Sequence, residues 1–188
     1  MGQQLHDLAN GIDRTNIREK YVPKETSLSI GQTLSRDYDK KGAALLLREM
    51  NDDLCLRLRM AGKKAGRVSV FVAYSAKFGG GFVHQATLNL PSDDNDALYE
   101  AICDIYFEHV GNFPIRNLGI SFAKLGEYSM EQLDIFSTPE EKKEKHDMWQ
   151  AIDRIRSRFG RNSCLRLSSL TEDSTILERH GQIGGHKA

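Results

Sequence analysis

The sequence predicts an α+β domain in which two helices cover one face of a four-stranded antiparallel sheet. Four segments alternate apolar and polar residues with the period of two that strands show. Two longer segments repeat apolar residues at steps of three and four, which is typical of amphipathic helices. In chain order these segments give β-α-β-β-α-β, an arrangement in which both helices can pack on the same sheet face.

The element boundaries follow from local signals. The strands are expected at residues 27–34, 67–74, 82–90 and 115–125, with a glycine-rich hairpin turn at 77–81. Asp39 is suited to cap the first helix and Gly62 to end it. A loop over 91–96 precedes the second helix, which Gly111 closes.

The flanking segments differ from this unit. Residues 1–25 offer one apolar helical turn and are otherwise polar, which is typical of a linker. After a loop at 127–138, Pro139 is suited to the first turn of a charged helix that reaches about Phe159. We expect a short extra strand at 164–170 and a mobile polar tail from 171 to 188.

Composition narrows the class of protein. The 188 residues include 26 basic and 26 acidic side chains, so the net charge does not indicate what kind of partner the protein binds. Basic residues are in excess over 26–90 and acidic residues over 91–147, which can give the fold one basic and one acidic side. The three cysteines have no metal-ligand spacing and indicate free thiols. With no long apolar stretch and no signal peptide, we expect a soluble cytoplasmic protein.

The sheet face that the helices leave open carries small and polar residues. They include Ser29, Gly31 and Thr33 on the first strand, and Asn117, Gly119 and Ser121 on the fourth. The basic residues at its rim are Arg36, Arg67, Lys77, Arg116 and Lys124. Such a surface lets a bulky partner approach the backbone closely, and it suits phosphates contacted without regard to sequence. An ordinary solvated sheet face explains the pattern equally well, although Phe71 fits that interpretation poorly.

A five-residue run, Gln132-Leu133-Asp134-Ile135-Phe136, follows the last strand. Its amide can fill a small polar hole while Leu133 and Phe136 lose their water in an apolar pocket, which indicates a peptide that docks on a partner. The alternative is that Leu133 and Phe136 anchor the loop to the core of this chain.

No constellation for catalysis stands out. Asp93, Asp94 and Asp96 precede a helix, where capping explains them better than metal binding. His84 falls on the helix-facing side of its strand, and Trp149 is expected to be a packing anchor. We therefore predict a binding function.

Seven short segments occur together in an order and spacing that is specific. They are TSLSIGQTL at 26–34, LLLREM at 45–50, RLR at 57–59, GGGF at 79–82, PIRNLGI at 114–120, IRSRFG at 155–160 and IGGHKA at 183–188. Together they resemble the C-terminal little finger domain of Y-family translesion DNA polymerases, in particular UmuC-type polymerases of Gram-positive bacteria. The resemblance covers nearly the whole chain.

The resemblance implies that the open sheet face lies in the major groove of primer–template DNA and contacts mainly phosphates. Carried over by position, the candidate DNA-contacting residues are Ser29, Gly31, Gln32, Thr33, Arg36, Arg116, Asn117 and Ser121. Bacterial members carry a sliding-clamp peptide of the form Gln-Leu-Ser/Asp-Leu/Ile-Phe. The run from Gln132 to Phe136 matches it at every position.

The resemblance also implies a division of the chain. Residues 1–25 would be the end of the thumb and a linker, 26–126 the little finger, 127–138 the clamp-binding loop, and 139–188 a C-terminal helix and tail. The family's catalytic palm, which holds two magnesium ions, lies upstream, so Met1 is expected to begin a piece of a longer polymerase. We expect no polymerase activity and no cofactor in this chain, and a parent that copies damaged templates in a bacterial DNA-damage response.

A function of another class stays open. The same sheet face could bind a second protein or a neighbouring domain and never contact DNA. The two functions differ in their salt dependence, because phosphate contacts weaken steeply as salt rises.

Overall fold

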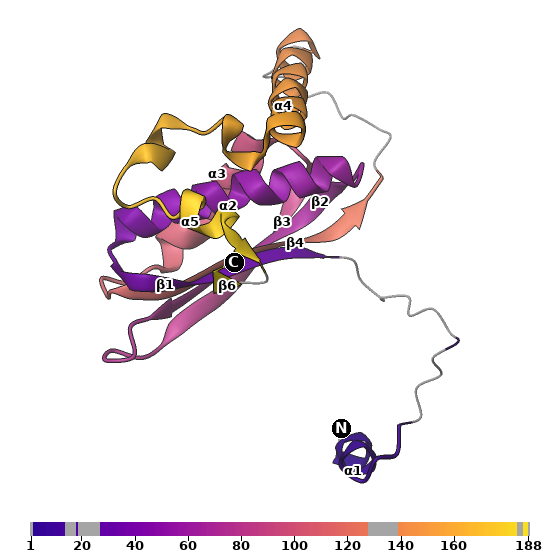
Figure 1. Ribbon diagram of the computed structural model, residues 1–188, viewed down its shortest axis with the longest axis vertical. Coiled ribbons are helices and arrows are strands. Elements are labelled where there is room, and N and C mark those ends of the chain that lie inside the picture. Colours follow the sequence, from indigo (N-terminus) through magenta and orange to yellow (C-terminus); the bar gives the residue numbers. More distant parts are fainter. Residues whose placement is uncertain (1, 14–17, 19–26, 128–138, 184–185, 188) are drawn as a thin grey trace.

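The computed structural model (Figure 1) describes residues 2–13, 18, 27–127, 139–183 and 186–187. The central unit consists of β1 (Leu28–Tyr38), α2 (Lys40–Met60), β2 (Lys64–Tyr74), β3 (Gly81–Ser92), α3 (Asn95–His109) and β4 (Ile115–Gly126). A short helix α1 (Gly2–Ala9) precedes it. After it come α4 (Pro139–Phe159), two 3₁₀ turns η1 (Arg161–Ser163) and η2 (Leu167–Leu170), α5 (Ile176–His180), β5 (Gln182–Ile183) and β6 (His186–Lys187).

The four long strands form one sheet in the order β1-β4-β2-β3, and every neighbouring pair is antiparallel. In Figure 1 the helices α2 to α5 all lie on one side of this sheet. The predicted fold class and the β-α-β-β-α-β order are therefore confirmed.

Local sequence signals set the element ends as expected. The Asp39 carboxylate accepts a hydrogen bond of 2.7 Å from the Gly42 amide at the start of α2. Asp94 does the same for α3, accepting from the amides of Asp96 and Ala97 at 3.0 and 2.8 Å. Side-chain acceptors at these positions satisfy amides that the first helical turn leaves unpaired.

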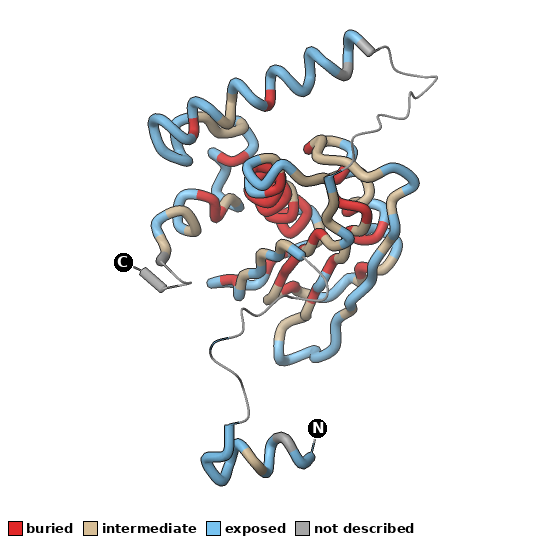
Figure 2. Tube along the Cα trace, turned by 90° about the vertical axis from the view of Figure 1, so that its right-hand side faces the viewer, coloured by how far each residue is buried: buried red, intermediate tan, exposed pale blue. Residues whose placement is uncertain are grey.

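The hydrophobic core lies between the sheet and the helices α2 and α3. Alternate residues of β2 and β4 point into it, so Val68, Val70 and Val72 are fully buried beside Phe122. The buried residues in Figure 2 concentrate along α2 and the strands, whereas α4 is mostly exposed. None of the described helices is both long enough and apolar enough to cross a bilayer.

The cysteines are free thiols, as the sequence indicated. Cys55 is buried inside α2, and burial raises its pKa well above the ordinary value of a thiol. Cys103 and Cys164 are partly buried.

Two expectations about the C-terminal part are wrong. The strand predicted at 164–170 is not formed: this stretch makes the 3₁₀ turn η2 and runs over the helix layer. The tail from Thr171 to His180 is held in place, because it ends in α5, which packs beside α2. We call residues 139–183 the C-terminal extension.

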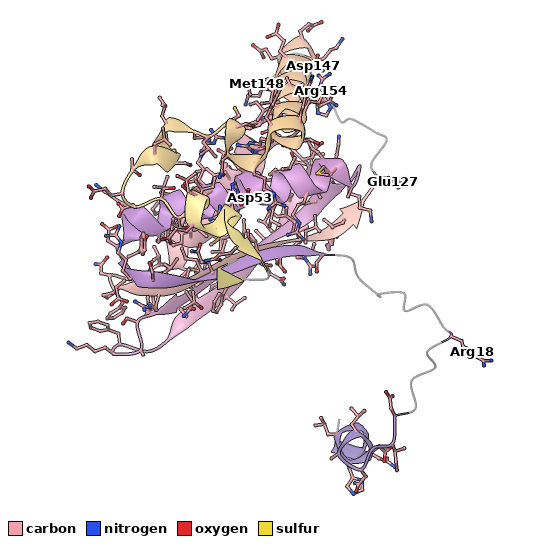
Figure 3. The ribbon with its side chains drawn as sticks, in the orientation of Figure 1. Arg18, Asp53, Glu127, Asp147, Met148 and Arg154 are labelled. Carbon is pink, nitrogen blue, oxygen red and sulfur yellow. The ribbon has the colours of Figure 1, made fainter. Side chains whose placement is uncertain are left out.

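Carboxylates on α2 hold the C-terminal extension against the helix layer. Arg166 donates to Asp52 at 2.6 Å, and Arg179 donates to Asp53 at 2.9 Å. His180 Nε2 lies 3.0 Å from the second oxygen of Asp53, and Figure 3 shows Asp53 on α2 next to α5.

The α4 end of the extension has its own anchors. Arg59 of α2 donates to Asp153 at 2.6 Å. Trp149 is buried, with the guanidinium groups of Arg59 and Arg166 at 5.6 and 5.1 Å from its ring, so the expected packing role is confirmed.

The contacts of Asp53 with Arg179 and His180 predict that the attachment of α5 to α2 weakens in acid. Burial alone would raise the pKa of Asp53, but the hydrogen bond from His180 and the charge of Arg179 outweigh it, and the pKa is lowered. A lowered folded-state pKa adds stability that is present above the unfolded value of about 3.9 and is lost as pH falls through the folded value. We expect hydrogen-exchange protection of α5 to fall below about pH 4, and the Asp53→Asn variant to lack this step. An α5 equally protected at pH 3 and pH 6 in the unmodified protein would contradict the prediction.

Candidate nucleic-acid interface

The sheet face opposite the helices is built in rows that run across all four strands. One row is Ser29, Ser121, Ser69 and Gln85; the next is Gly31, Gly119, Phe71 and Val83; the third is Thr33, Asn117, Ala73 and Gly81. We call this surface the open face. Its side chains are short over β1 and β4, so the sheet backbone is closest to the surface there.

A shallow hollow of about 270 Å³ occupies the middle of the open face. Gly31 and Gly119 form part of its floor, and a side chain on Gly119 would approach the β1 backbone and the Phe71 ring. Phe71 and Val83 stand at its side and remain 42% and 68% exposed. The open face therefore combines a glycine floor with an apolar side, which a purely solvated sheet face does not require.

Backbone contacts with a partner are restricted to the sheet edges. Strands β2 and β4 pair on both sides, so the ladder takes up their N–H and C=O groups. Among the strands that the structure describes, β1 and β3 are the two edges of this sheet, and on β1 the Ser29 carbonyl accepts a hydrogen bond of 3.1 Å from Arg57. A partner that binds the open face must therefore contact mainly the side chains of that face.

Five of the predicted DNA-contacting residues lie together on the open face: Ser29, Gly31, Thr33, Asn117 and Ser121. The Thr33 hydroxyl donates to the Asn117 side-chain oxygen at 2.7 Å, which links β1 to β4. Gln32 points to the opposite face, where its side-chain oxygen accepts a 3.0 Å hydrogen bond from Thr175 of the C-terminal extension.

The two predicted arginines, Arg36 and Arg116, lie where the pairing of β1 and β4 becomes irregular, and each has a carboxylate partner. Arg36 is in phase with buried Leu34 and Tyr38, which places it on the helix side of β1 rather than on the open face. Arg36 donates to Asp173 at 2.7 Å and to the Glu172 carbonyl at 3.0 Å. Arg116 lies 3.5 Å from Asp37.

Arg67 occupies the end of the open face away from Arg116. It continues the open-face alternation of β2 and is in register with Ala123 and Thr87. Among the residues that the structure describes, none forms an ion pair with it. The sequence predicted Arg67 at the rim of the open face. Its side chain points to that face because the next residue, Val68, points into the core and is buried.

The run from Gln132 to Phe136 lies outside the described residues. It falls between Glu127, where the chain leaves β4, and Pro139 at the start of α4 (Figure 3). Both its docking role and the alternative, an anchor to the core, stay predictions.

The candidate catalytic groups have structural roles. Asp94 caps α3, while Asp96 accepts a hydrogen bond from Arg48 at 2.8 Å. His84 stacks on His109 of α3 with ring centroids 3.7 Å apart, which agrees with its expected place on the helix-facing side of β3. Within the described residues, no group of three or more His, Cys, Asp or Glu side chains is placed to hold a metal ion.

The fold and the open face define a little finger-type domain, the class of α+β module that the sequence resembles. Residues 25–135 match the impB/mucB/samB family C-terminal domain, and the chain belongs to this family. The resemblance to the C-terminal little finger of Y-family DNA polymerases is thereby confirmed.

Individual relatives agree with this family. The chain is 31% identical to "DNA polymerase IV 2" of Bacillus subtilis (strain 168), over 98% of this chain and 45% of the relative. It is 29% identical to the "Putative UV-damage repair protein UvrX" of the same organism, over 100% of this chain and 45% of the relative. The chain thus spans about half the length of the curated relatives it matches.

A solved structure described as a complex of the beta-clamp processivity factor and the little finger domain of PolIV is also similar. It shares 15% identity with a TM-score of 0.44, covering 58% of this chain and 98% of that one.

Proposed function

We propose that this chain is the part of an error-prone translesion DNA polymerase that holds primer–template duplex and docks on the bacterial sliding clamp. The observation that carries the proposal is the open face: rows of small polar side chains, with Arg67 at one end and Arg116 near the other, in a domain of this family. In this proposal the chain binds the duplex and positions the polymerase on the clamp.

The dimensions of the open face suit a duplex. Arg67 and Ala73 are six positions apart on β2, which corresponds to about 20 Å along the strand. The major groove is about 12 Å wide. A face of this length can cross the groove and bring its two ends to phosphates of both strands, while the short side chains between them avoid a clash with the bases.

Clamp docking rests on the run from Gln132 to Phe136. A short peptide of this kind binds weakly by itself, but tethering raises the local concentration of polymerase at the primer end. Nucleotidyl transfer and its magnesium ions belong, in this proposal, to the part of the polymerase that lies outside the region matched by the chain.

A salt series on duplex binding tests the proposed grip. Each phosphate contact should contribute about 0.9 to the slope of log K against log salt, so we expect a steep negative slope from several contacts. Affinities for duplexes of unrelated sequence should agree within about threefold, because phosphates carry no sequence information.

The measurement is fluorescence anisotropy with labelled duplexes between about 50 and 200 mM salt. A protein-interaction module would show little duplex binding at any salt concentration, and that outcome would reject DNA binding by the open face.

A further inference from the structure

Two phenylalanine side chains stand exposed at one end of the sheet. Phe78 lies in the β2–β3 turn and Phe113 in the loop before β4, and they are 52% and 50% exposed. Their ring centroids are 5.8 Å apart, and the Phe113 ring also packs edge-on against Tyr74 at 5.3 Å. We call Tyr74, Phe78 and Phe113 the aromatic cluster. Its two outer rings do not belong to the hydrophobic core and present flat apolar area to solvent.

Hydrogen bonds hold the two loops of the aromatic cluster in place. The Ser75 amide donates to the Pro114 carbonyl at 2.8 Å, which joins the β2–β3 turn to the loop before β4. Within the turn, the Phe78 amide donates to the Ser75 carbonyl at 2.8 Å. In the other loop, the Gly111 amide donates to the Tyr74 hydroxyl at 2.8 Å. The rings are therefore presented by a fixed backbone, so a partner binds them without having to order these loops first.

The surroundings of the two outer rings are open and cationic. Three glycines at 79–81 follow Phe78 and have no side chains that could cover its ring. The two loops, residues 75–80 and 110–114, contain a single charged residue, Lys77. Its Nζ atom lies 5.9 Å from the centre of the Phe78 ring. A partner of this surface therefore meets exposed aromatic faces next to a positive charge.

This combination of groups suits unpaired nucleotides. The bases inside a duplex stack on one another, whereas an unpaired base has a free face that can stack on an aromatic side chain while a cation contacts its phosphate. The aromatic cluster adjoins the open-face row of Thr33, Asn117, Ala73 and Gly81. A strand that leaves a duplex at this end of the open face arrives at the exposed rings. This continuity favours nucleic acid over a protein partner.

We propose that the aromatic cluster binds the single-stranded template where it leaves the primer–template duplex. Unpaired bases stack on Phe78 and Phe113, and Lys77 contacts their phosphates. The inference rests on the proposed duplex binding and extends it to the single-stranded continuation of the template. It also gives the bound DNA a direction, because the cluster lies toward the unpaired template and the Arg67 end of the open face lies over the duplex.

Fluorescence anisotropy with three DNAs that share one duplex tests this proposal. The first DNA is blunt, the second has a 5′ template overhang of about six nucleotides, and the third has the same overhang without its bases. The unmodified protein should bind the second DNA on the order of fivefold more tightly than the first, because unpaired bases stack on the rings. The abasic overhang should raise affinity by less than about twofold, because it offers only phosphates.

Variants of the unmodified protein locate the effect. Phe78→Ser should remove most of the gain from the overhang and leave blunt-duplex affinity unchanged, whereas Phe78→Tyr should keep the gain because it keeps a ring. Lys77→Gln should reduce the salt slope of overhang binding by about 0.7, the contribution of one single-strand phosphate. The matched control is Phe159→Ser on α4, which removes a ring that is 67% exposed and has Arg158 at 5.3 Å. It should keep the full gain, and thermal unfolding verifies that each variant keeps its fold.

The outcomes separate this inference from the proposed function. If the protein binds blunt duplex with a steep salt slope but gains nothing from the overhang, or gains as much from the abasic one, the aromatic cluster does not bind unpaired bases and the proposed function stands. A gain that persists when Phe78→Ser and Phe113→Ser are combined would equally reject the aromatic cluster. If none of the three DNAs shows salt-dependent binding, the proposed function and this inference are both overturned.

Discussion

Replacing Gln132, Leu133 and Phe136 together with alanine is expected to weaken binding to the bacterial sliding clamp by more than about 100-fold. Buried apolar anchors each contribute about 2 kcal/mol or more in peptide recognition, and about 1.4 kcal/mol corresponds to a factor of ten. Removing both anchors and the amide leaves little that can be desolvated in the pocket. Surface plasmon resonance with immobilised clamp measures the change.

The matched control is Asp134→Ala, which alters the spacer of the same run and should change clamp affinity by less than about threefold. Duplex affinity and the unfolding temperature should be the same in both variants and in the unmodified protein. If Leu133 and Phe136 instead anchor the loop to the core, the triple variant would lower the unfolding temperature and leave clamp affinity unchanged. That result would reject the docking peptide.

The central unit could be predicted because its signals are local. The alternation of Val68, Val70 and Val72 fixed the inner face of β2, and the capping residues Asp39 and Asp94 fixed the helix starts. Each of these signals acts over a few residues and is satisfied by the chain next to it. For the same reason the membership of the open face followed from the alternation alone.

The helix from Pro139 to Phe159 was predicted, but the docking of the C-terminal extension on α2 could not be, because its contacts are distant and ionic. Asp52 and Asp53 lie outside the apolar stripe of their helix, so periodicity assigns them to solvent. In the structure Arg166 and Arg179, more than a hundred positions later, reach and bury them. Nothing in the spacing of either segment indicates which arginine meets which carboxylate.

For Gln32 the family resemblance and the alternation of residues along the strand make different predictions. The resemblance assigned it to DNA, whereas the alternation of β1 places it with Ile30 and Leu34 toward the helices. Its hydrogen bond to Thr175 follows the alternation. The ion pair between Arg36 and Asp173 could not be predicted from the sequence either, because Asp173 becomes the partner of Arg36 only once the extension has folded over α2.

Substituting Asp53 by alanine is expected to detach α5 and to lower the free energy of unfolding by about 3–5 kcal/mol. Arg179 and His180 are almost fully buried, with side chains 9% and 5% exposed, and both depend on this carboxylate. Without it, Glu49 is the one carboxylate among the described residues that still faces the Arg179 guanidinium, and its nearest oxygen lies 3.7 Å away. Removing one partner of a buried pair leaves an uncompensated charge, which the protein avoids by exposing the segment that carries it.

Urea unfolding measures the loss of stability, and hydrogen exchange shows whether α5 opens before the sheet does. The buried Trp149 reports on the α4 half of the extension and should keep its native fluorescence in the variant. Replacing both partners, as Asp53→Leu with Arg179→Leu, should recover part of the stability, because the guanidinium no longer has to be buried without Asp53. Glu49 loses its pairing with Arg179 but keeps the hydrogen bonds that Ser174 and Thr175 donate to it. The exposed ion pair between Arg36 and Asp173 serves as the comparison: Asp173→Ala should lower the free energy of unfolding by less than about 1 kcal/mol. An Asp53→Ala protein as stable as Asp173→Ala would show that the carboxylates on α2 do not hold the extension in place.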